Sequence, residues 1–315
     1  MRNAWRIAAA GFAAMTITTA ASAADSDACK TVRFSDVGWT DITSTTAMAS
    51  RILTALGYTP KTTVLAVPVT YESMKNKDID VFLGNWQPTM ESIRKPYIDD
   101  KTVDLVQKAN LEGAKYTLAV PTYTFDAGLK SFADIAKFKD QLDGKIYGIE
   151  PGNDGNKLIQ DMIDKDAFGL KGFTMVESSE QGMLAEVDRA TRQNKPIVFL
   201  GWEPHPMNSK YKMSYLAGGD DFFGPDYGGA TVYTNTRAGY VGECPNAGKF
   251  ITNLTFSLPM ENEVMGKILF DGEDAGKAAE EWLKANPTAW TAWLDGVTTF
   301  DGKPGLDAVK ASLGL

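Results

Sequence analysis

Short apolar strands alternate with amphipathic helical segments along most of the chain, and this alternation limits the possible folds more than any other feature. In residues 48–56, Met48, Ile52 and Leu56 recur at the spacing of one helical face. Residues 81–84 and 197–200 are instead short, continuous apolar runs, typical of strands covered on both faces. Alternating elements of this kind predict an α/β protein with mostly parallel sheets flanked by helices.

One strand-like phrase occurs twice, as "VFLGNWQP" at residues 81–88 and as "VFLGWEPHP" at residues 198–206. Each copy is an apolar run that stops at glycine and then presents a tryptophan. In open α/β sheets, ligands sit beyond the carboxyl ends of the strands. We therefore assign one copy to each of two similar lobes that face each other across a cleft.

The lobe boundaries follow from two segments that we interpret as crossings, residues 110–120 and 228–239. We predict that residues 24–114 and 237–315 form lobe I and that residues 115–236 form lobe II. No linker is long or proline-rich, so short strands should join the lobes and act as the hinge.

The N-terminus has the pattern of a secretory signal peptide. Arg2 and Arg6 are followed by an apolar run that ends in an A-x-A cleavage signal at residues 21–23. A disordered N-terminal arm is the alternative. No later stretch is apolar for 18 residues, so we expect an exported protein located in the periplasm. In that oxidising compartment Cys29 and Cys244 predict one disulfide, with two free buried thiols as the alternative.

The residues available for chemistry do not favour an enzyme. The formal net charge of −8 argues against binding to nucleic acid or to anionic membrane surfaces. His205 is the single histidine, which removes most histidine-based catalysis and any poly-histidine metal site. No nucleophile elbow, phosphate loop or dinucleotide-binding fingerprint occurs. We expect no cofactor and no metal, and we interpret Asp78 and Asp80 as solvated loop ends.

Aromatic residues are the stronger signal. Trp39, Trp86 and Trp202 follow three predicted strands, and Tyr116 lies on the first crossing. Any one such tryptophan is compatible with simple packing, as we assign to those in residues 282–293, but three at equivalent strand ends favour a ligand site. Several ring faces suit a quaternary ammonium, which donates no hydrogen bonds. Sugar stacking is the competing interpretation.

The motifs "GWTD", "GNWQP", "GAKYTLAVP", "GIEPGNDGN" and "GWEPHPM" occur in this order. With them the sequence resembles the substrate-binding proteins of bacterial ABC importers for quaternary amines, and within that group the periplasmic choline-binding proteins. The resemblance covers nearly the whole chain after residue 29. It implies a type II periplasmic binding protein fold, with two α/β lobes that close on choline by a hinge movement. It also implies a membrane permease as partner and a monomeric protein.

The resemblance further implies roles for individual residues. An aromatic box around the trimethylammonium group matches four positions, Trp39, Trp86, Tyr116 and Trp202. A polar pair at the alcohol end of the ligand matches Asp41 and Asn153. The cysteine pair matches as well. Asp41 and Asn153 each precede a predicted helix, so an N-cap role is the alternative for both.

The resemblance leaves open which quaternary amine is bound. A carboxylate at Asp41 would accept a hydrogen bond from the hydroxyl of choline and repel the carboxylate of glycine betaine. His205 and the glycine-rich residues 151–155 favour betaine, although we interpret His205 as structural. Acetylcholine is a third possibility. A choline-ester hydrolase would need a nucleophile paired with a base, and the sequence offers no such pair.

Overall fold

The computed structural model describes residues 25–315, so the predicted signal peptide lies outside the described residues. The strands are β1 (Thr31–Asp36), β2 (Thr59–Val64), β3 (Val81–Gln87), β4 (Val103–Pro121), β5 (Lys145–Tyr147), β6 (Thr174–Val176), β7 (Phe199–Glu203), β8 (Met213–Tyr215) and β9 (Gly229–Arg237). The α-helices are α1 (Thr40–Ala55), α2 (Val67–Lys75), α3 (Glu91–Asp99), α4 (Thr122–Asp126), α5 (Asp154–Asp164), α6 (Glu180–Arg192), α7 (Met207–Lys210), α8 (Asp220–Phe223), α9 (Pro225–Gly228), α10 (Tyr240–Glu243), α11 (Pro245–Asn253), α12 (Leu258–Phe270), α13 (Ala275–Ala285) and α14 (Gly305–Leu313). Short 3-10 helices are η1 (Asp27–Cys29), η2 (Phe132–Phe138), η3 (Ala167–Gly169) and η4 (Thr291–Leu294).

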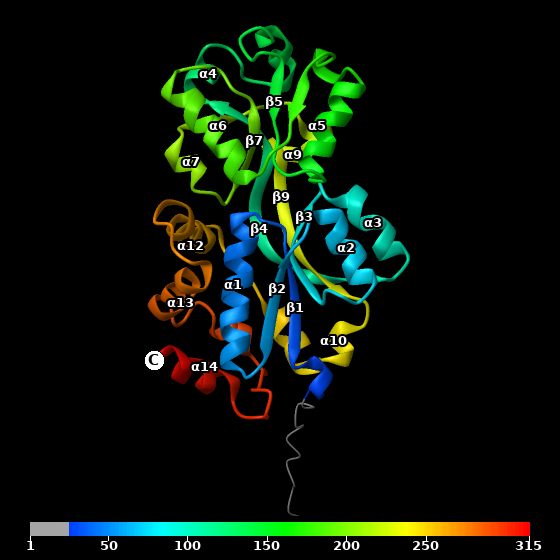
Figure 1. Cartoon of the computed structure of the whole chain (residues 1–315), viewed down its shortest axis with the longest axis vertical. Coiled ribbons are helices and arrows are strands. Elements are labelled where there is room, and N and C mark those ends of the chain that lie inside the picture. The colour runs from blue at the N-terminus through cyan, green and yellow to red at the C-terminus, as the bar shows by residue number, and fades with distance from the viewer. Residues whose placement is uncertain (1–24) are drawn as a thin grey trace, which may run out of the picture.

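The protein has the predicted two-lobed α/β architecture (Figure 1). One lobe contains β1, β2 and β3 with α1, α2 and the C-terminal helices, and the other contains β5 and β7 with α4 to α7. β4 and β9 run side by side between them, so both predicted crossings are strands. β4 is a single strand of 19 residues.

The strands form one hydrogen-bonded path in the order β2-β1-β3-β9-β4-β7-β5-β6, and β8 pairs with β4. The outer strands of each lobe are parallel, as predicted. The central pairs β3–β9, β9–β4 and β4–β7 are antiparallel. The sheet is therefore more mixed than predicted, because one crossing strand leaves the first lobe and the other returns to it.

The glycine shared by the two repeated phrases has a packing role in both. A Cβ at Gly84 in β3 would lie 2.8 Å from Ile42 Cδ1, and one at Gly201 in β7 would lie 2.7 Å from Met213 Cε. Each strand is thus approached closely by a neighbouring side chain just before its tryptophan. The peptide bond before the following proline is cis in both copies.

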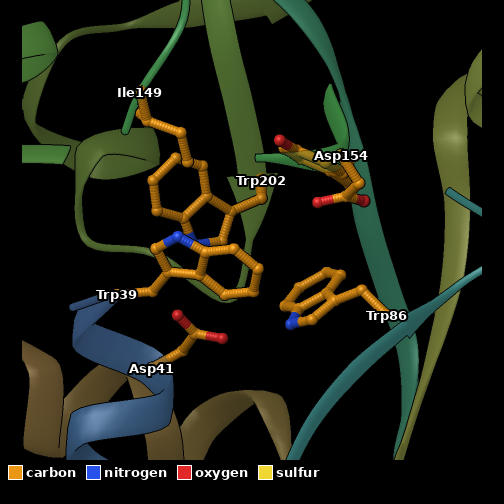
Figure 2. A pocket seen from close by; sticks show the side chains of 7 residues that line it. Trp39, Asp41, Trp86, Ile149, Asp154 and Trp202 are labelled. Atoms are coloured by element: carbon orange, nitrogen blue, oxygen red, sulfur yellow. The ribbon is translucent and has the colours of Figure 1, made fainter. Parts of the chain in front are cut away.

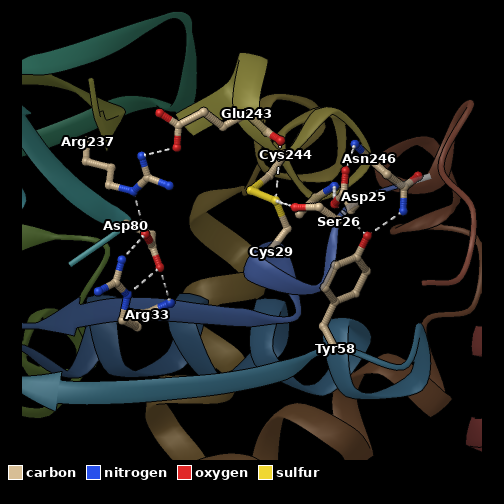
Figure 3. Close-up of a disulfide and its surroundings, with 11 residues drawn as sticks. Asp25, Ser26, Cys29, Arg33, Tyr58, Asp80, Arg237, Glu243, Cys244 and Asn246 are labelled. Carbon is tan, nitrogen blue, oxygen red and sulfur yellow. Dashed lines mark hydrogen bonds and ion pairs between the residues drawn. A yellow bond between two sulfur atoms is a disulfide. The ribbon is translucent and has the colours of Figure 1, made fainter. Parts of the chain in front are cut away.

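The base of the first lobe carries the predicted disulfide, between Cys29 and Cys244 (Figure 3). The prediction that Asp80 is solvated is wrong, because the residue is only 1% exposed. Its carboxylate accepts hydrogen bonds from Arg33 Nε at 2.8 Å and Arg237 Nε at 2.7 Å. These arginines lie on β1 and β9, so the sequence around Asp80 could not show that they converge on it.

The helical tail is packed against the first lobe. Trp290 and Trp293 are buried, and their indole N–H groups donate to the backbone oxygens of Leu283 and Thr255. This confirms the packing role assigned to the tail tryptophans. Among residues 25–315, no helix has the length and apolar character needed to cross a bilayer.

Candidate functional site

A small cavity of about 250 Å³ lies between the lobes, at the carboxyl ends of β1, β3, β5 and β7 (Figure 2). It is lined by Trp39, Asp41, Trp86, Tyr116, Ile149, Asp154 and Trp202. The structure therefore brings five of the six predicted ligand-binding residues to one cavity. Asn153, the sixth, does not line the cavity but lies directly behind it.

The three indole rings come from different elements. Trp39 is the N-cap residue of α1 and follows a turn in which Gly38 has a φ of 84°. That left-handed conformation favours glycine and allows the sharp entry from β1 into the helix. Trp86 and Trp202 lie near the ends of β3 and β7, as the repeated phrase predicted.

Tyr116 connects the two halves of the aromatic cluster. It lies on β4, opposite Trp202 on β7. Its ring centroid is 6.1 Å from that of Trp86 and 6.4 Å from that of Trp202, both in edge-to-face geometry. Burial raises the pKa of its phenol well above the usual value, and the hydroxyl donates to Asn153 Oδ1 at 2.8 Å. A Cβ at Gly155 would lie 2.1 Å from this hydroxyl, so glycine is required there.

Asp41 lines the cavity and does not cap its helix. The N-cap of α1 is Trp39, and Asp41 lies in the first turn, so the N-cap alternative for Asp41 is wrong. Its side chain is buried, and its Oδ1 has no hydrogen-bond partner. Burial, and then the nearby carboxylate of Glu180, raise its pKa well above the usual range.

Asn153 caps α5 and still leaves part of its side-chain amide without a hydrogen-bond partner. Its Oδ1 accepts from the backbone N–H of Asn156 at 3.1 Å and so caps α5. Its Nδ2 is buried without a hydrogen-bond partner, which leaves a donor free for another group. The cap therefore uses only the side-chain oxygen of Asn153 and leaves its Nδ2 donor without a partner.

Ile149 and Asp154 also line the cavity, although no sequence pattern pointed to either residue. Asp154 is buried, neither of its carboxylate oxygens has a hydrogen-bond partner, and burial raises its pKa to about 6. Asp154 adjoins Asn153 in the motif "GIEPGNDGN", but the sequence could not show which of the two side chains points inward.

The cavity has a strongly acidic character. In Figure 2 the carboxylates of Asp41 and Asp154 lie on opposite sides of the indole rings. Glu150 accepts from Trp39 Nε1 at 2.9 Å just outside, and burial raises its pKa to about 7. Among the described residues, the seven that line the cavity include no lysine, arginine or histidine. Buried carboxylates without cationic partners favour a positively charged ligand.

His205 does not line this cavity. Its ring centroid lies 4.7 Å from that of Trp202, and its Nδ1 accepts from the Met207 backbone N–H at 2.9 Å. The interpretation of His205 as a structural residue therefore agrees with its position.

Comparisons with known proteins agree with this geometry. A family model described as the substrate-binding domain of ABC-type glycine betaine transport systems, OpuAC, matches residues 30–285. The chain is 66% identical to an ABC-transporter choline binding protein in complex with choline, with a TM-score of 0.91 over 92% of this chain and 100% of that chain. Lactococcal OpuAC in its closed form with glycine betaine is 27% identical, with a TM-score of 0.75 over 84% of this chain and 98% of that chain.

The solved structures also show which conformation of the two lobes the present structure resembles. An ABC-transporter choline binding protein in an unliganded semi-closed conformation has the same 66% identity and the same coverage, but a TM-score of 0.84. The present structure is therefore closer to the conformation seen with choline. This agrees with the small cavity and with the hydrogen bond from Trp39 to Glu150, which joins the two lobes.

Proposed function

The chain belongs to the family of substrate-binding domains of ABC-type glycine betaine transport systems, and from this premise we propose that it captures choline between its lobes and delivers it to the permease of an ABC importer. One observation carries the proposal. The cavity combines three indole rings with two buried carboxylates and no cationic side chain among its seven lining residues. Aromatic faces attract a quaternary ammonium, and the carboxylates add charge complementarity.

We propose that the trimethylammonium group sits against four rings, those of Trp39, Trp86, Tyr116 and Trp202. The hydroxyl of choline would donate to Asp41 and accept from the free Nδ2 of Asn153. Asp154 would supply a second negative charge. The cavity is small and is lined by only seven residues, so it suits a small molecule.

Choline is favoured over glycine betaine by charge. Betaine has the same ammonium head but ends in a carboxylate, which would enter a cavity that already holds Asp41 and Asp154. Close like charges disfavour binding by several kcal/mol. Betaine sites need cationic donors or free backbone N–H groups at the carboxylate end. Acetylcholine keeps the cation but loses the hydroxyl donor, so we expect it to bind more weakly than choline.

The proposal also covers the lobe boundaries, the location and the oligomeric state of the protein. We propose that residues 24–114 and 237–315 form lobe I and residues 115–236 form lobe II, with β9 as the returning connection. We also propose that the protein is exported by residues 1–23 and works in the periplasm as a monomer. The disulfide is compatible with an oxidising compartment.

A titration of intrinsic tryptophan fluorescence with choline, acetylcholine, glycine betaine and glucose tests the function. We expect saturable binding of choline, weaker binding of acetylcholine, at least tenfold weaker binding of betaine, and no response to glucose. Tighter binding of betaine than of choline at neutral pH would overturn the choice of choline as ligand. Binding of glucose alone would overturn the assignment of quaternary amines as the class of ligand. Incubation with acetylcholine, followed by measurement of free choline, tests the hydrolase alternative, and we expect no release.

A further inference from the structure

We propose that Glu180 is a positioning residue that caps helix α1 from the opposite lobe, so that closure of the lobes holds Trp39 and Asp41 in their binding positions. Glu180 is the first residue of α6 in the second lobe, whereas α1 belongs to the first lobe. The inference deepens the proposed function and rests on it for the identity of the ligand.

The contacts of Glu180 are those of a helix cap. Its Oε2 accepts from the backbone N–H of Thr40 at 2.7 Å, and its Oε1 accepts from Thr40 Oγ1 at 2.6 Å. The first N–H groups of a helix have no partner within the helix, and a negative charge there is favourable. Trp39, the N-cap residue of α1, provides no side-chain cap. The cap comes instead from a residue 140 positions away in sequence.

The lone histidine orients the capping carboxylate. His205 Nε2 lies 3.1 Å from Glu180 Oε1. Because His205 Nδ1 accepts from the Met207 backbone N–H, Nε2 carries the proton and donates to Glu180. The carboxylate therefore accepts three hydrogen bonds while being only 1% exposed, two from the first lobe and one from the second.

The position of Thr40 connects this cap to the ligand site. Thr40 lies between Trp39 and Asp41, which both line the cavity. When the lobes separate, Glu180 and Thr40 move apart, because they belong to different lobes, and the first turn of α1 loses its cap. The open form should therefore hold these two side chains less rigidly than the closed form does.

The charge of Glu180 makes closure sensitive to the ligand. Its carboxylate lies close enough to Asp41 to raise the pKa of Asp41, in addition to the larger effect of burial. Closing the empty lobes thus brings like charges together in a buried place. A bound cation next to Asp41 offsets this repulsion, so the cap should form most completely around a quaternary ammonium.

The test measures the association and dissociation rates of choline by stopped-flow tryptophan fluorescence. We expect Glu180→Ala to raise the dissociation rate at least tenfold and to change the association rate less than threefold, because the cap forms after the ligand has entered. Thr40→Val removes one of the two bonds with little change of shape, and we expect a rise of roughly threefold to tenfold. Thr40→Ser retains the hydroxyl and should dissociate more slowly than Thr40→Val.

Glu186→Ala is the matched control. Glu186 lies on the same helix, and its substitution removes the same charge, but its partner is Arg189 on that helix. A dissociation rate of Glu180→Ala within twofold of the wild type, or equal to that of Glu186→Ala, would overturn the inference. If Glu180→Ala does not fold, the two Thr40 variants decide. If the wild-type protein binds betaine but not choline, the choice of choline as ligand is refuted, but the capping role of Glu180 is not. The same association and dissociation rates would then be measured with betaine.

Discussion

Replacement of Trp86 by alanine tests the aromatic site directly. Trp86 is buried in the cavity wall and contacts Tyr116 edge to face at a centroid distance of 6.1 Å. Removal of the indole eliminates one ring face that would contact the ammonium, worth about 2 kcal/mol in a desolvated site. It also removes the edge-to-face contact of Trp86 with Tyr116, which holds the tyrosine ring in place and contributes about 1 kcal/mol.

These two effects amount to a loss of about 3 kcal/mol in binding free energy, which corresponds to a rise in Kd of about a hundredfold. Isothermal titration calorimetry with choline at neutral pH measures this change. Trp86→Phe keeps a smaller ring in the same place, so we expect an intermediate loss of about tenfold.

Trp282→Ala provides the matched control. Trp282 is also buried, but it lies on α13 and donates to Glu263 Oε2 at 2.8 Å, outside the cavity. Its removal should lower the melting temperature while changing the Kd for choline less than twofold. Binding of choline by Trp86→Ala within twofold of the wild type would refute a role of Trp86 in the site, and so would an equal loss of binding in Trp282→Ala.

Three further perturbations test the charges and the disulfide. Asp41→Asn should weaken choline binding tenfold or more by calorimetry and raise the ratio of betaine to choline affinity, because it removes a charge-assisted hydrogen bond; an unchanged ratio would refute the charge argument. Burial raises the pKa of Glu150 to about 7 and that of Asp154 to about 6, so the closed, empty form binds more protons than a form with solvated carboxyls. Lowering the pH from about 8 to about 5 should therefore favour closure of the empty protein, and a radius of gyration that does not decrease in small-angle scattering would contradict this. Joint replacement of Cys29 and Cys244 by serine should cost up to about 5 kcal/mol of stability through the long loop and lower the melting temperature by about 5 °C or more. The affinity for choline should stay within twofold, since the disulfide lies outside the cavity, and an unchanged melting temperature would count against the loop argument.

Much of the site could be predicted because strand ends can be recognised locally. The apolar runs before Trp86 and Trp202 indicate buried strands, and the carboxyl ends of such strands meet at the ligand cleft. Asp154 was missed for a physical reason. Asn153 and Asp154 are adjacent at the start of α5, and only packing against Tyr116 decides that the carboxylate lines the cavity while the amide caps the helix.

The sequence by itself determined the strand and helix pattern, the two lobes, the cysteine pair and the aromatic residues, since each depends on local periodicity, on turn residues or on recognisable motifs. Only the tertiary structure decided how charges meet. Asp80 is buried because arginines from β1 and β9 converge on it. Glu180 caps α1 because lobe closure brings it to Thr40, 140 residues away. Such pairings depend on distances in space between segments remote in sequence, and no local pattern records them.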